Sequence, residues 1–100
     1  MLITWSETAA RHIRTRSYRY PGAVDIAPEW TMEALEDPEM LWLEPDPKSD
    51  SGLGIRIIGY SISAGFVVTI IAFRHAGGLF GATAYQTTGS DLRAYREGVS

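Results

Sequence analysis

The chain is 100 residues long, with 45% hydrophobic residues, 21% charged residues and no cysteine. This length suits a single domain over residues 1–100 with one core, and the composition excludes an intrinsically disordered chain. The lack of cysteine excludes disulfides and thiolate zinc sites, and no apolar run approaches the ~18 residues of a membrane span. We therefore expect a cytoplasmic protein that does not contact a membrane.

The net charge of −3 is distributed unevenly along the chain. Residues 25–50 carry nine acidic residues and one base, Lys48, which gives −8. The rest of the chain carries eight arginines and three acidic residues, which gives +5. A chain that is acidic overall can therefore present a basic, anion-binding face, although a solvated acidic helix and scattered surface arginines would give the same pattern.

The first half of the chain contains four predicted elements. Residues 2–5, LITW, alternate as a short strand does, and a helix follows to about residue 16 with Thr4 or Ser6 as its N-cap. A second helix is predicted over residues 26–37, where the Asp37-Pro38 step ends it. Residues 40–44 then predict a strand, and the sequence EPDPKSDSGLG predicts a long loop.

The second half predicts three strands and a helix. The stretches IRIIGYSI, FVVTIIAFR and LFGATAY are separated by short turns at SAG and HAGG, which is typical of an antiparallel meander. A final helix is predicted in TTGSDLRAYREG, with an N-cap near Thr88 and a stop at Gly98. The order β-α-α-β-β-β-β-α predicts an α+β fold, with a mostly antiparallel twisted sheet and helices on one face.

Two arginines, Arg56 and Arg74, lie in the most apolar part of the chain. A turn near residues 63–65 would place Arg56 opposite about residues 72–74, so we expect the two guanidinium groups to be neighbours. Such a pair needs an anion between its members, either a bound phosphodiester or a carboxylate of the chain. Alternatively, each arginine covers apolar surface at the sheet edge or pairs with its own acidic residue.

Other kinds of site have little support in the sequence. The two histidines, His12 and His75, do not stand in a metal-ligand motif, and the glycine-rich stretches lack the residues of a phosphate loop. No serine lies in a nucleophile elbow. We therefore expect neither a metal nor a cofactor. Tyr85 and Tyr95 are expected at the edge of the core, with hydroxyls that reach water.

Residues 2–97 resemble the BrnT group of RelE/ParE-like toxins. The resemblance is carried by ITWSETAARHIRTR, EALEDP, PDPKS, IRIIGYS with GFVVTIIAFR, and TTGSDLRAYREG. It implies a RelE-like fold and a small, cytoplasmic, bacterial ribonuclease toxin of a toxin–antitoxin system, active without a metal. It also implies a cognate antitoxin, expected to be of the ribbon-helix-helix type.

The resemblance also implies roles for particular residues. Arg56 and Arg74 would hold the scissile phosphate during attack by the 2′-hydroxyl and stabilise the charge that develops on it. His12, Arg16 and Tyr85 would assist proton transfer or positioning. The remaining arginines expected to contact RNA are Arg11, Arg14, Arg93 and Arg96.

The chain departs from the family pattern at two places. Thr15, Arg16 and Ser17 stand where the family usually has Lys-His-Gly, and Tyr85 stands where it usually has an arginine. A diverged binding module is therefore the alternative to a ribonuclease, acting through protein association, for example between the acidic segment 25–39 and a basic partner. An unrelated α+β domain with a small-molecule pocket is a third interpretation.

Overall fold

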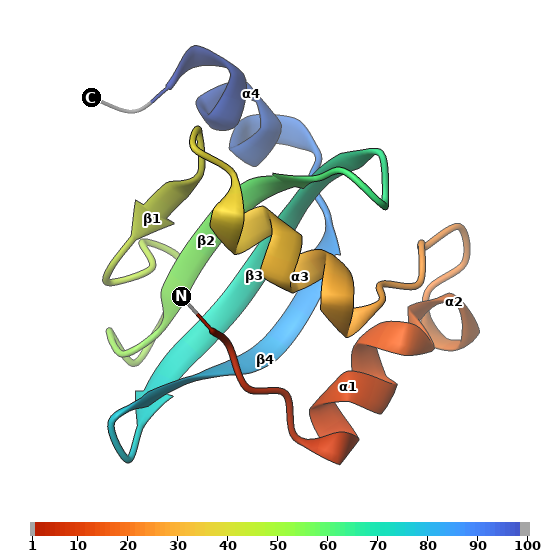
Figure 1. The fold of residues 1–100 in the computed structure, drawn as a ribbon, viewed down its shortest axis with the longest axis horizontal. Coiled ribbons are helices and arrows are strands. Elements are labelled where there is room, and N and C mark those ends of the chain that lie inside the picture. The colour runs from red at the N-terminus through yellow and green to blue at the C-terminus, as the bar shows by residue number, and fades with distance from the viewer. Residues whose placement is uncertain (1, 99–100) are drawn as a thin grey trace.

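A four-stranded antiparallel sheet forms the centre of the molecule in the computed structural model, which describes residues 2–98 (Figure 1). The strands lie in the order β1-β2-β3-β4. Their bounds are β1 Leu41–Leu43, β2 Ile55–Ser61, β3 Phe66–His75 and β4 Gly78–Gln86. The helices are α1 Glu7–Arg14, α2 Arg16–Arg19, α3 Pro28–Glu36 and α4 Gly89–Glu97. The α+β class and the antiparallel meander predicted from the sequence are thus confirmed. The expectation that all helices pack on one face is wrong for α4, because its Asp91 bonds to Arg56 on the face opposite α3.

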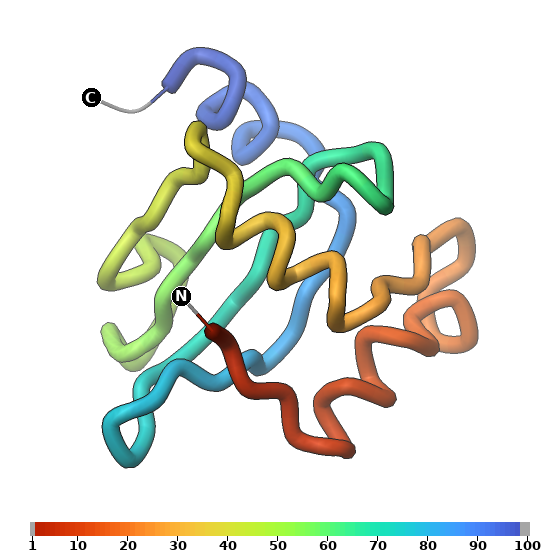
Figure 2. Tube along the Cα trace, viewed as in Figure 1, coloured from red at the N-terminus to blue at the C-terminus, as the bar shows by residue number. Residues whose placement is uncertain are grey.

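The core lies between the sheet and the helices α1 and α3, where apolar residues of the helices meet those of the strands. Figure 2 shows the segment after α2 running back to α3, which crosses the sheet. Residues such as Ile13, Ile57 and Ile70 are fully buried there. Gly59 allows α3 to lie directly on β2, because a Cβ at this position would fall 2.2 Å from the carbonyl oxygen of Ala34.

The predicted strand at residues 2–5 is wrong. Only Thr4 joins the sheet, as a parallel bridge to Phe80, with Thr4 N–H donating to the Leu79 carbonyl at 2.8 Å. The next residue, Trp5, turns into the core and occupies the space that a side chain at Gly81 would need. The alternating pattern of LITW therefore comes from two residues that contact the core, the buried Ile3 and Trp5, and not from a strand.

The helix predicted to reach about residue 16 is divided at Thr15. Ser6 is its N-cap, as one of the two predicted alternatives, and its side chain accepts a hydrogen bond from Ala9 N–H at 3.1 Å. Thr15 leaves helical geometry, with φ −125° and ψ 29°, and its hydroxyl donates to the Arg11 carbonyl at 2.7 Å. Arg16 therefore begins the short helix α2, and its guanidinium lies over the rings of Tyr20 and Tyr85.

The remaining helix boundaries follow the sequence signals. Helix α3 ends at Glu36, before the Asp37-Pro38 step, and α4 ends at Glu97 with Gly98 as its C-cap at φ 74°. Thr88 is the N-cap residue of α4, as predicted, although its side chain makes no capping hydrogen bond. Tyr95 fixes α4 to the end of α3, with its hydroxyl donating to Asp37 at 2.5 Å. No helix within residues 2–98 is long and apolar enough to cross a membrane.

Candidate functional site

Arg56 is held inside the protein by two carboxylates. Its side chain is on the face of the sheet opposite the α3 core, and the residue is only 5% exposed. Nε donates to Asp46 Oδ1 at 2.9 Å, and Nη1 donates to Asp91 Oδ2 at 2.7 Å and to the Tyr85 hydroxyl at 2.9 Å. We call Arg56, Asp46, Asp91 and Tyr85 the Arg56 cluster.

The Arg56 cluster is an ion-paired centre that keeps its charges despite its burial. Burial favours the neutral form of Asp46, but hydrogen bonds from Arg56 and from Lys48 N–H outweigh it and lower the pKa of this carboxyl. Burial likewise opposes the charge on Arg56, but its hydrogen bonds to Asp46 and Tyr85 raise the pKa of the guanidinium. Four of the five N–H donors of Arg56 are thus engaged inside the protein, and its 5% exposure leaves little access for an external phosphate.

Arg74 has a different carboxylate partner and lies in an exposed position. Its Nε and Nη2 donate to the two oxygens of Glu44 at 2.8 and 2.9 Å, and its guanidinium carbon lies 5.9 Å from the centre of the Trp42 ring. Hydrogen bonds from Arg74 and Trp42 lower the pKa of Glu44 to about 2. The bidentate pair occupies the Nε/Nη2 edge of the guanidinium, so a phosphate would have to compete with Glu44 for that edge.

The expectation that Arg56 and Arg74 are neighbours is wrong. Arg56 is opposite Ile71 in the β2–β3 register, so Arg74 lies three residues further along β3. Because successive side chains alternate between faces, Arg74 points to the face opposite Arg56. The position of Trp42 agrees, since it pairs with Ile57, whereas Arg56 pairs with Leu43. The two arginines therefore do not form one cationic site.

A hollow of about 240 Å³ lies beside the open edge of β4, and Arg16 is its charged residue. We call it the Arg16 hollow; its lining residues are Arg16, Gly22, Ala23, Val24, Tyr85, Gln86 and Thr88. The Arg16 guanidinium carbon lies 5.0 Å from the centre of the Tyr20 ring and 5.3 Å from that of Tyr85. Arg16 forms no salt bridge with any carboxylate of residues 2–98.

The surroundings of the Arg16 hollow are basic. Arg11 and Arg14 are exposed on α1, and Arg19 donates hydrogen bonds to the Thr15 hydroxyl and the His12 carbonyl. Burial, together with the charges of Arg19 and Arg16, lowers the pKa of His12. The shift disfavours the protonated imidazole, but His12 does not line the hollow. Segment 7–20 carries four arginines against one acidic residue, Glu7.

The other expected RNA-binding arginines, Arg93 and Arg96, lie on α4, where Arg93 is exposed. Figure 1 shows α4 well separated from α1 and α2, so these arginines and those of segment 7–20 do not form one patch. Within residues 2–98, no group of three or more histidines and carboxylates is arranged to hold a metal ion.

The structure thus joins some of the expected site residues and separates others. Tyr85 links the two regions, since its hydroxyl accepts from Arg56 while its ring faces Arg16. Tyr20, Asp46 and Asp91 were not expected at the site. The sequence offers only a weak signal for Asp46 and Asp91, because each reaches Arg56 through the tertiary fold. Tyr20 lies only four residues after Arg16, so helical spacing could have indicated that contact.

Comparison with known proteins identifies no relative. A scan against protein-family models gives no match, and a search of curated proteins gives none either.

Proposed function

We propose that this protein has the BrnT-like variant of the RelE/ParE fold, and that it is a diverged module that binds RNA at the Arg16 hollow. A cytoplasmic location and a cognate antitoxin belong to the same proposal, because the sequence resemblance implies both. The α+β meander is compatible with that fold.

The observation that carries the proposal is the setting of Arg16. Of the three arginines at the sheet, Arg56 and Arg74 are paired with carboxylates, whereas Arg16 meets two tyrosine rings. A guanidinium without a carboxylate partner is available to a phosphate, and Tyr20, which is 48% exposed, offers a ring on which a base can stack. The exposed arginines of α1 add a favourable potential for a polyanion.

Efficient cleavage is not part of the main proposal. The implied mechanism needs several donors aimed at the charge that develops on the scissile phosphate. Arg56 and Arg74 are occupied and lie on opposite faces, so one guanidinium remains near the hollow. Loss of a single such donor lowers kcat by about 10² to 10³.

A slow, metal-independent ribonuclease activity is the second candidate. It is favoured by the meeting of Arg16, Tyr85 and Thr83, where Arg16 Nη1 lies 3.5 Å from the Thr83 hydroxyl. In this arrangement a cation could stabilise a phosphate beside two hydroxyl groups. The same RNA samples distinguish the two candidate functions. Anisotropy measures binding of intact RNA, whereas gel electrophoresis detects cleaved RNA.

The test is a titration of a fluorescein-labelled single-stranded RNA with the intact protein, followed by fluorescence anisotropy. We expect binding that weakens as salt rises from about 50 to 200 mM, because phosphate contacts release counterions. Arg16→Ala should weaken binding about tenfold, whereas Arg93→Ala on α4 should change it less than about twofold.

Two results would overturn the proposal. One is RNA binding that is insensitive to Arg16→Ala in a variant whose urea unfolding curve is normal. The other is rapid cleavage of the RNA by the wild-type protein in the presence of EDTA. This would show that the carboxylate partners of Arg56 and Arg74 do not prevent these arginines from acting in catalysis.

A further inference from the structure

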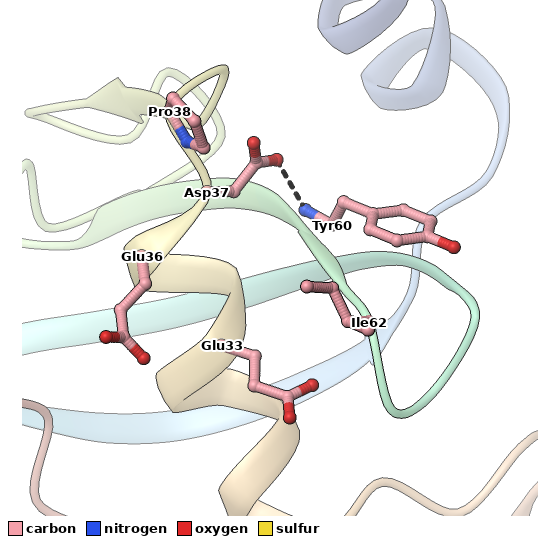
Figure 3. Close-up of a pocket in the computed structure, with 6 residues that line it drawn as sticks. All are labelled: Glu33, Glu36, Asp37, Pro38, Tyr60 and Ile62. Atoms are coloured by element: carbon pink, nitrogen blue, oxygen red, sulfur yellow. Dashed lines mark hydrogen bonds between the residues drawn. The ribbon is translucent and has the colours of Figure 1, made fainter.

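A second concave surface lies between α3 and the end of β2, away from the Arg16 hollow (Figure 3). It encloses about 430 Å³. We call it the acidic groove; its lining residues are Glu33, Glu36, Asp37, Pro38, Tyr60 and Ile62. Unlike the Arg16 hollow, it contains no basic residue among those that line it.

The floor of the acidic groove is apolar and exposed. Ile62 is 82% exposed and Tyr60 is 40% exposed, and Pro38 adds a further apolar side chain at the end of α3. A large aliphatic side chain at this exposure gains free energy when a partner covers it. The groove therefore offers apolar surface that the chain itself does not bury.

The rim of the acidic groove carries uncompensated negative charge. Glu33, Glu36 and Asp37 line it, and none of them forms a salt bridge within residues 2–98. The one base of segment 25–50, Lys48, lies 3.8 Å from Asp91 instead. Such a rim repels nucleic acid and attracts a cationic partner.

The walls of the acidic groove are held in place by hydrogen bonds. Glu33 accepts from the Ser61 hydroxyl at 2.6 Å and from Ser63 N–H at 2.8 Å, which joins α3 to the β2–β3 turn. Asp37 accepts from Tyr60 N–H at 2.8 Å, the bond drawn in Figure 3. These contacts form without a ligand, so little ordering cost remains for binding.

We propose that the acidic groove binds a basic, amphipathic segment of a partner protein. Apolar side chains of that segment cover Tyr60 and Ile62, while its lysines or arginines lie along the rim at Glu36 and Asp37. Charge complementarity selects this occupant over an acidic peptide, and the apolar floor selects it over a purely charged one. The inference is independent of RNA binding, because the two surfaces share no residue.

The test uses a fluorescein-labelled helical peptide of about 14 residues, with leucines along one face and lysines along the other. Two comparison peptides complete the set: one with the same composition but no apolar face, and one with glutamate in place of lysine. We expect the Leu/Lys peptide to bind the intact protein at least about tenfold more tightly than either.

Matched substitutions locate the binding surface. Ile62→Ser should weaken binding of the Leu/Lys peptide about tenfold, whereas Leu53→Ser, at an equally exposed apolar residue on another loop, should not. Glu36→Gln should weaken it about threefold at low salt, whereas Glu97→Gln on α4 should not. Urea unfolding of each variant verifies that the fold is intact.

Other outcomes would overturn the inference. Equal effects of Ile62→Ser and Leu53→Ser would show that the peptide does not use the groove. If the peptide without an apolar face binds as tightly as the Leu/Lys peptide, the groove does not recognise the apolar face. If the glutamate peptide binds as tightly, the groove does not recognise the positive charge. Self-association of the wild-type protein in sedimentation velocity, lost in Ile62→Ser, would assign the groove to a second copy of this chain.

Discussion

The Arg56 cluster and the Arg16 hollow use the same side chain for opposite purposes. Arg56 is 5% exposed and donates to two carboxylates and a phenol, so its hydrogen bonds are made inside the fold. Arg16 is half-buried between two aromatic rings and has no carboxylate partner among residues 2–98. Partners and burial, rather than residue type, therefore decide whether an arginine stabilises the fold or binds a ligand.

The difference begins in the loop between β1 and β2. Asp46 N–H donates to the Gly54 carbonyl at 2.7 Å, which folds the loop back over the start of β2. This brings the Asp46 carboxylate onto Arg56, and α4 brings Asp91 to the same guanidinium. At the edge of β4, the loop that follows α2 carries Asp25, but this carboxylate accepts hydrogen bonds from Ser17 and forms no salt bridge with Arg16.

Removal of Arg56 should have the largest effect. Arg56→Ala leaves the buried Asp46 without its cation and leaves the half-buried Asp91 with only Lys48 nearby, and breaking such a buried pair costs about 3–5 kcal/mol of unfolding free energy. Urea denaturation followed by circular dichroism measures this loss. Arg93→Ala, at an exposed position, should change the value by less than about 0.5 kcal/mol. A similar stability for both variants would contradict a structural role for Arg56.

Acid should reduce the contribution of the Arg56 cluster to the unfolding free energy. Folding lowers the pKa of Asp46, so its contribution to stability is complete above the unfolded value of about 3.9 and is lost as the pH falls through the lower, folded value. The measurement is the urea midpoint from about pH 6 to pH 2.5. Asp46→Asn lacks this titration and should lose less stability over the same range; an identical loss would show that Asp46 is not linked to folding.

The Tyr85 hydroxyl should have a smaller effect. Tyr85→Phe removes one acceptor from Arg56 but leaves the bonds to Asp46 and Asp91, so we expect a loss of about 1 kcal/mol in unfolding free energy. Tyr20→Phe is the matched control, since Tyr20 is 48% exposed and its ring lies on the other side of Arg16. Equal stability of the two variants would remove Tyr85 from the Arg56 cluster.

The sequence was sufficient for most of the fold because its signals are local. Alternating apolar residues with short glycine turns defined the meander, and the Asp37-Pro38 step marked the end of α3. The two errors near the N-terminus have tertiary causes. Thr4 makes only one bridge because Trp5 enters the core, and the break at Thr15 depends on a φ change that helical periodicity does not reveal.

The site was less predictable because it depends on register and on distant partners. Antiparallel pairing of β2 and β3 was foreseen, but a register shift of one residue decides whether Arg56 and Arg74 share a face. A carboxylate partner for Arg56 was one of the alternatives left open, yet its identity required the path of the loop at Asp46. Arg16 and Tyr85 lie far apart in the sequence, so no local sequence pattern predicts their contact.

The central claim is that Arg16, and not the arginines of the strands, provides the ligand contact. It is tested most directly by RNA dissociation constants of Arg16→Ala and Arg74→Ala, measured side by side by anisotropy at about 50 mM salt. We expect about a tenfold loss for Arg16→Ala and less than about a twofold change for Arg74→Ala, whose fork is held by Glu44. A loss of RNA affinity in Arg74→Ala, together with normal RNA binding by Arg16→Ala, would contradict the account.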